Sequence, residues 1–144
     1  MKIACVYLFL LLPGFFLWDC SGPKRDQQSK PFPLGDYQYV GFDKKGDKIV
    51  EGRLRITSRE GDRIKGEWQL SKIGNPENIG PQTGTGELTG LITGDTLIIN
   101  LNPNMVDNNV NLKGSIKDRR YSGTWSFDGF APGINKGTFE AVRK

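Results

Sequence analysis

The residue types that most often carry catalysis are scarce in this chain. It contains no histidine, so the commonest general base and the commonest zinc ligand are both absent. Its two cysteines are Cys5 and Cys20, so the rest of the chain has no disulfide and no thiolate metal site. We therefore expect a protein that is not an enzyme and that carries no metal and no cofactor.

Carboxylates offer no clear alternative. Without histidine, an enzyme would depend on serine or on a carboxylate mechanism such as that of the glycosidases. Acids on predicted strands, such as Glu51, Glu67 and Glu140, fall on the outward face, and Asp36 is the exception. No two of these carboxylates are placed as a glycosidase pair.

Four aromatic residues are candidates for ligand binding. Trp68, Tyr121, Trp125 and Phe127 fall on the face of predicted strands that points inward. There they could stack on a small ligand or simply fill the interior, because a small barrel has room for little more than its own side chains.

Three residues in Asn- and Pro-rich segments are candidates for partner contact. Asn104 and Met105 follow Pro103, and Phe130 precedes Ala131-Pro132-Gly133. Apolar side chains in such polar loops form either a contact tip or a cover folded over the end of the domain. Both readings remain open.

The charges indicate no nucleic-acid partner. The chain has 20 Lys and Arg against 16 Asp and Glu, a formal net charge of +4. The two signs alternate without a basic run, which is typical of a solvated surface. Export from the cytoplasm, which the N-terminal segment predicts, would also separate the protein from nucleic acid.

The N-terminal segment is unlike the rest of the chain. Lys2 precedes an apolar run over 3–12, a Pro13-Gly14 break, a second apolar run over 15–18, and then Cys20. The apolar stretch is shorter than the roughly 20 residues of a transmembrane helix. This order resembles a bacterial lipoprotein signal, in which the cysteine becomes the first mature residue and carries lipids such as palmitate.

The resemblance implies a signal peptide over 1–19, lipidation of Cys20 and an exported protein anchored to the membrane of the cell envelope. Leu17 matches the apolar position three before the cysteine. The alternative is that Cys20 is incidental, beside a leader that is uncleaved or cleaved elsewhere. Residues 20–33 are polar and proline-punctuated, which predicts a flexible tether.

From residue 36 onward, apolar and polar residues alternate with period two between turn signals, which predicts strands. The expected strands are 36–42, 48–58, 63–71, 85–93, 95–101, 109–117, 120–127 and 137–143. One face carries Leu54, Ile56, Ile64, Gly66, Trp68, Leu70, Leu97, Ile99, Leu101, Val110, Leu112, Gly114, Ile116, Tyr121, Gly123, Trp125, Phe127, Phe139 and Ala141. The opposite face is charged, unlike the lipid-facing side of an outer-membrane barrel.

Glycine recurs inside the apolar series, as at Gly66 and Gly123, where it leaves room for large neighbours in a narrow barrel. Eight sequential strands with this alternation look like the calycin-type architecture of lipocalins and avidins over 36–143, without the motif of a particular family. The resemblance implies an all-β fold, an eight-stranded antiparallel up-and-down barrel over 34–144, which we expect to be a monomer.

The connections differ in length from one end of the predicted barrel to the other. Three are tight, near residues 61, 94 and 118, and the four alternating with them, over 43–47, 72–84, 102–108 and 128–136, are longer. In an up-and-down barrel the long connections share one end, opposite the tether and the C-terminus.

We therefore expect a membrane-anchored binding protein of the cell envelope that uses its long-loop end toward an unknown protein, glycan or small-molecule ligand. Two alternatives are a carrier of a small amphipathic ligand in the barrel cavity and an inhibitor of an exported hydrolase.

Overall fold

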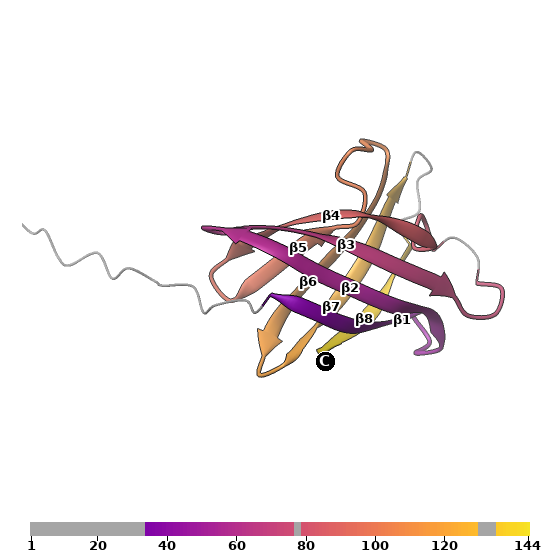
Figure 1. Ribbon diagram of the computed structural model, residues 1–144. Helices are drawn as coiled ribbons and strands as arrows, with labels where there is room; N and C mark the ends of the chain where they lie inside the picture. Colours follow the sequence, from indigo (N-terminus) through magenta and orange to yellow (C-terminus); the bar gives the residue numbers. More distant parts are fainter. Residues whose placement is uncertain (1–33, 77–78, 130–134) are drawn as a thin grey trace, which may run out of the picture.

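The protein is a closed barrel of eight antiparallel strands that follow one another in chain order, as the sequence predicts (Figure 1). The computed structural model describes residues 34–76, 79–129 and 135–144. The predicted signal peptide over 1–19, Cys20, the predicted tether over 20–33 and Phe130 lie outside these residues. Within the described part there is no helix, and so none long and apolar enough to cross a membrane.

The strands match the alternation in the sequence, and each predicted end lies within two residues of the observed one. They are β1 Gly35–Phe42, β2 Lys48–Glu60, β3 Arg63–Lys72, β4 Gly84–Thr93, β5 Thr96–Asn100, β6 Asn108–Lys117, β7 Arg120–Gly129 and β8 Asn135–Arg143. Pairing of β1 with β8, for example Tyr39 with Ala141, closes the sheet. Closure leaves no free strand edge.

The apolar face of the strands fills the barrel. All of the apolar side chains predicted to point inward are buried, except Ile116 and Phe127, which are partly buried and pack against the core. Tyr37 and Tyr39 of β1 also point inward. The ring of Phe139 lies between two tyrosines, 5.9 Å from the ring centre of Tyr39 and 4.7 Å from that of Tyr121. The described core runs from Tyr37 to Ala141 and closes on itself, so we expect residues 34–144 to fold as one unit.

The structure corrects the prediction for Asp36. Because Tyr37 and Tyr39 point inward, the alternation of β1 places Asp36 and Gln38 on the outer face. The Asp36 carboxylate accepts hydrogen bonds there from Nε and Nη2 of Arg55, at 2.8 and 3.3 Å. Asp36 therefore does not line the interior.

Glycines inside strands make room for the large aromatic rings. A Cβ on Gly86 of β4 would lie 2.7–2.8 Å from the indole ring of Trp68 on the neighbouring β3. Only a residue without a side chain leaves space for this ring. The glycine pattern in the sequence thus reports on packing inside the barrel.

The two ends of the barrel differ, as predicted. The connections 61–62, 94–95 and 118–119 have two residues each. In each, the first residue has a positive φ: 60° at Gly61, 59° at Gly94 and 58° at Asp118. A positive φ at this position is a feature of two-residue hairpin turns.

The longer connections 43–47, 73–83 and 101–107 alternate with the tight ones, so their described residues belong to the opposite end, where β7 also ends and β8 begins. We call this end the long-loop end and the other the compact end. The backbone N–H of Lys144 donates to the carbonyl oxygen of Asp36 at 3.0 Å, and that of Arg143 donates to Arg119 at 2.8 Å. The start of β1 and the C-terminus therefore lie together at the compact end.

Candidate functional site

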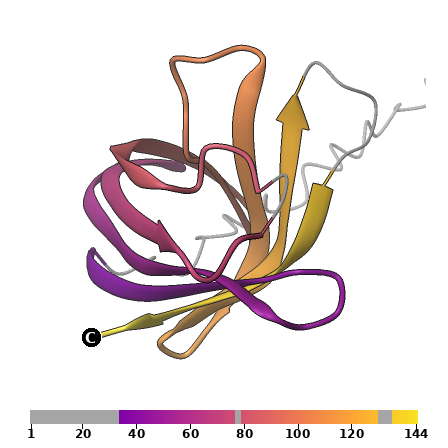
Figure 2. The same cartoon turned by 90° about the vertical axis from the view of Figure 1, so that its right-hand side faces the viewer.

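A pocket of about 420 Å³ lies at the long-loop end, and we call it the mouth pocket. Figure 2 looks toward this end of the barrel. The pocket receives residues from the β1–β2 connection, from the β3–β4 connection and from the strands β2, β7 and β8. It is lined by Asp43, Lys44, Lys45, Asp47, Ile49, Ile73, Pro76, Ile79, Trp125, Asn135 and Lys136.

The floor of the mouth pocket is apolar. Ile49 and Ile79 are each 7% exposed, and Trp125 is 2% exposed. The indole Nε1 of Trp125 donates to the carbonyl oxygen of Phe42 at 2.7 Å, which fixes the ring at the base of the pocket. Ile73 and Pro76, both half-buried, continue this apolar surface. A ligand could bury an apolar group here.

The rim of the pocket is charged. Lys44, Lys45 and Lys136 are exposed on it, together with Asp47. The Asp43 carboxylate turns into its own loop, where Oδ1 accepts hydrogen bonds from the backbone N–H groups of Lys45 at 2.8 Å and Asp47 at 2.9 Å. These hydrogen bonds, that from Asp47 foremost, hold the pKa of Asp43 below its usual value.

The described part of the β3–β4 connection crosses the barrel end in Figure 2, and Ile73, Pro76 and Ile79 from it line the mouth pocket. Gln82 is fully buried although its side chain is polar. Its Oε1 accepts a hydrogen bond from the Tyr39 hydroxyl at 3.1 Å, and its Nε2 donates to the carbonyl oxygen of Ile79 at 2.7 Å. Gln82 thus ties the connection to the core. The sequence analysis did not identify it.

Two of the predicted site residues, Trp68 and Tyr121, are structural within the described barrel. Trp68 is 5% exposed, and its Nε1 donates to the carbonyl oxygen of Leu101 at 2.6 Å. Tyr121 is 1% exposed, and its hydroxyl donates to the carbonyl oxygen of Leu112 at 2.8 Å. Both polar groups are satisfied by backbone, so these rings fill the interior, which is one of the two roles expected of them.

Trp125 and Phe127 lie nearer the mouth. Trp125 lines the mouth pocket, so the structure places this predicted aromatic residue at the long-loop end. Phe127 is partly buried and packs against the core, with Gly80 of the β3–β4 connection against its ring. A side chain at Gly80 would collide with this ring, so Phe127 helps to seat the connection.

Asn104 and Met105 lie on the β5–β6 connection and do not line the mouth pocket. Met105 is 52% exposed, and the adjacent Val106 is 89% exposed. The loop is held by hydrogen bonds from Met105 N–H to the carbonyl oxygen of Asn102 at 3.1 Å, and from Asn102 Nδ2 to that of Asn108 at 3.1 Å. Met105 therefore forms an exposed tip rather than a cover over the barrel.

Burial raises the pKa values of three phenol groups in the barrel. Desolvation raises the pKa of Tyr37 to about 12, with Arg143 acting in the opposite direction. Burial also raises the pKa values of Tyr39 and Tyr121 far above the usual range. At neutral pH the three hydroxyls are hydrogen-bonding groups, and none is suited to act as a base.

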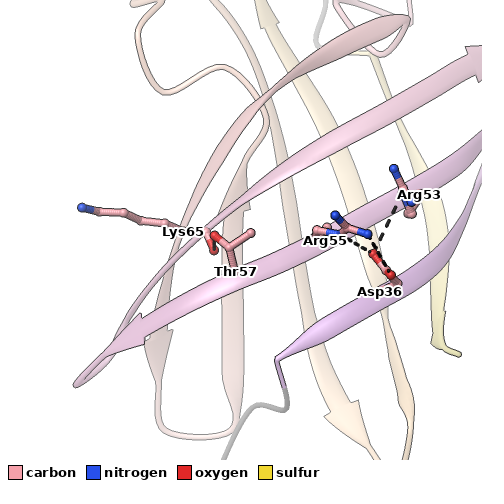
Figure 3. Close-up of polar contacts among 5 residues, drawn as sticks. All are labelled: Asp36, Arg53, Arg55, Thr57 and Lys65. Carbon is pink, nitrogen blue, oxygen red and sulfur yellow. Dashed lines mark hydrogen bonds and ion pairs between the residues drawn. The ribbon is translucent and has the colours of Figure 1, made fainter.

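A second hollow, of about 320 Å³, lies on the outer wall over β2, β3 and β4. Figure 3 shows part of this wall, where Asp36 of β1 lies between Arg53 and Arg55 of β2. The Arg55 hydrogen bond is the main cause that holds the pKa of Asp36 below its usual value. Across β3 and β4, Glu67 pairs directly with Glu87.

The charged side chains of this second hollow, Arg53, Arg55, Glu67 and Glu87, are exposed and of both signs. Trp68 also lines it and is the one apolar side chain among its lining residues, whereas the mouth pocket adds three isoleucines and a proline to Trp125. Among the residues that the structure describes, no three His, Cys, Asp or Glu side chains gather as they would around a metal ion.

No protein-family model matches the chain, and no curated protein matches it in sequence. Its fold resembles solved structures of low sequence identity. The structure of EF1p2_mFAP2b bound to DFHBI superposes with a TM-score of 0.56 at 14% identity, over 77% of this chain and 93% of that one. A redesigned β-barrel, b11L5F_LGL, gives a TM-score of 0.51 at 13% identity, over 77% and 90%. These likenesses confirm the β-barrel fold and nothing finer.

Proposed function

We propose that the chain is an exported, lipid-anchored protein of the bacterial cell envelope that binds a partner at the long-loop end of its barrel. The mouth pocket is the observation that carries this proposal. It combines an apolar floor with a charged rim, and it lies opposite the end where the described chain begins and ends. A closed barrel is a rigid base for such loops.

Binding rather than catalysis follows from the groups present. The mouth pocket offers lysines, aspartates, an asparagine and apolar side chains, without a histidine or a thiol. The pKa of the Asp43 carboxylate on the rim is lowered, whereas a carboxyl group that acts as a general acid needs a raised pKa. A protein or a glycan could be bound there, and the exposed Met105 tip would add apolar contact for a protein.

A second candidate function, a carrier of a small amphipathic ligand, is favoured by the apolar floor of the mouth pocket. EF1p2_mFAP2b, a barrel of similar fold, was solved with DFHBI bound. In the present chain, Trp68, Tyr121 and Phe139 occupy the interior, so such a ligand would bind at the mouth and not at the centre. The pocket volume is within the range of small-molecule sites, roughly 300–1,000 Å³.

The anchor makes the first prediction. The full chain expressed in bacteria should be recovered in the membrane fraction, with Cys20 at its mature N-terminus carrying the mass of a lipid modification. Cys20→Ser should abolish the lipid modification, and the mature protein with residue 20 at its N-terminus should no longer be recovered from the membrane fraction. Cys5→Ser should change neither result. Mass spectrometry of the N-terminal peptide measures the modification, and an unmodified Cys20 in the wild-type chain would contradict the lipid anchor.

Binding at the long-loop end makes the second prediction. Immobilised residues 34–144 should retain a component of a bacterial envelope extract. The double variant Ile73→Asp/Lys136→Glu should lose it, because the change places charge on the apolar floor and reverses charge on the rim. Lys113→Glu, on the outer face of β6, should retain it. Quantitative mass spectrometry of the eluates is the measurement, and equal retention by all three proteins would place the contact elsewhere.

A further inference from the structure

We propose that the mouth pocket selects an amphipathic anion, with a flat apolar group on the pocket floor and the anionic group among the rim lysines. This inference rests on the proposed function, since it names the chemistry of the ligand that the long-loop end would bind. It is carried by the arrangement of the floor and by the charges around it.

The floor accepts an apolar group of limited size. Ile49 and Ile79 are almost fully buried and lie beside the fixed indole ring of Trp125. Burial of apolar surface against such side chains is favourable by about 25 cal/mol per Å². A pocket of about 420 Å³ has room for a compact ring system.

The rim favours a negative charge. Lys44, Lys45 and Lys136 line the pocket and are exposed, and none of them forms an ion pair with another described residue. Their flexible stems can bring the ammonium groups toward a ligand above the floor.

The rim carboxylates offset only part of this charge. The Asp43 carboxylate accepts two backbone hydrogen bonds within its own loop, so its Oδ1 is engaged there. Asp47 is the other carboxylate lining the pocket. Three ammonium groups therefore line the pocket with two carboxylates, and the formal balance of these side chains is +1.

The experiment compares three small probes of the same ring size with purified residues 34–144. They are 2-naphthalenesulfonate, the neutral 2-naphthalenesulfonamide and the cationic 2-naphthylmethylammonium. Affinity is measured by isothermal titration calorimetry at low salt, and the site is located from backbone amide shifts in NMR spectra. We expect the sulfonate to bind at least tenfold more tightly than either of the others, with shifts centred on Ile73, Ile79 and Lys136.

Matched variants separate charge from shape. Lys44→Gln/Lys45→Gln/Lys136→Gln should reduce sulfonate affinity at least tenfold and leave sulfonamide affinity within twofold. Lys113→Gln, on the outer wall, should change neither. Raising the salt concentration to about 0.5 M should reduce the difference in affinity between the sulfonate and the sulfonamide, because ions screen exposed charges.

Equal binding of the charged and neutral probes at the mouth would overturn the selection for an anion and leave the proposed function in place. Binding of the sulfonate elsewhere on the barrel, with no shifts near Ile73, would overturn the inference as well. If none of the three probes binds at the mouth while the envelope extract still yields a mouth-dependent partner, the ligand is not a small amphipathic anion, although the proposed function survives.

Discussion

Gly66→Ala should lower the free energy of unfolding by about 3 kcal/mol, the range of severe core overpacking. Gly66 of β3 pairs with Ile56 of β2, next to the register shift between Ile56 and Ser58. A Cβ at this position would collide with the carbonyl oxygen of Arg55 and would lie 3.1 Å from the Cα of Ile56. Backbone atoms cannot rotate out of the way, so the two strands would have to separate.

The matched control is Gly94→Asn. Gly94 lies in the two-residue β4–β5 turn with a φ of 59°, and no atom lies within 4 Å of the position of its missing Cβ. Asparagine tolerates this backbone conformation, so we expect a loss of about 1 kcal/mol or less. Urea unfolding of residues 34–144 followed by circular dichroism measures both. Equal stability of the two variants would show that β2 and β3 do not approach as closely as described.

The strands and their inward faces could be predicted because apolar and polar residues alternate along each strand with period two. In β3, Ile64, Trp68 and Leu70 are buried while Lys65, Glu67 and Gln69 between them are exposed. A charged outer face and an apolar inner face fix both the register and the closure of the sheet. The two ends of the barrel followed from connection lengths alone, since alternate connections of an up-and-down barrel share one end.

The mouth of the barrel could not be predicted in the same way. Ile79 and Gln82 lie in an irregular connection, where no periodicity indicates which side chains turn inward. Ile79 is an apolar residue in a polar loop, the same pattern that marks Met105 and Phe130. Gln82 gave no signal, because an amide is buried only when specific partners satisfy it, and those partners are set by the fold.

The prediction for Asp36 was wrong because the sequence did not indicate which residues of β1 point inward. The inward residues of β1 are Tyr37 and Tyr39, whose hydroxyl groups make them weaker markers of an interior than leucine or isoleucine. Because Tyr37 and Tyr39 were not assigned to the inner face, Asp36 was not placed on the outer face with the other strand acids. The structure places it outside with Arg55, at 2.8 Å, so the interior of the described barrel gains no acidic group from β1.

The hydrogen bond between Tyr39 and Gln82 should contribute strongly to stability, because it holds the β3–β4 connection against the core. Gln82→Met keeps the volume of the side chain but leaves the Tyr39 hydroxyl and the Ile79 carbonyl oxygen without these partners. We expect a loss of about 2–4 kcal/mol, since each buried polar group without a partner costs about 1–3 kcal/mol. Tyr39→Phe keeps the ring beside Phe139 and should cost about 1–3 kcal/mol, because it leaves Gln82 Oε1 unpaired.

The double variant decides whether this pair acts as a unit. If it does, Tyr39→Phe/Gln82→Met should lose at least 1 kcal/mol less than the sum of the two single losses, because neither polar group is then left buried alone. Additive losses would contradict the coupling. Since Ile79 belongs to the pocket floor and is tied to Gln82, amide hydrogen exchange at Ile79 should become faster in Gln82→Met. The same variant should bind 2-naphthalenesulfonate more weakly than Lys113→Gln does, because the pocket depends on a connection that Gln82 holds in place.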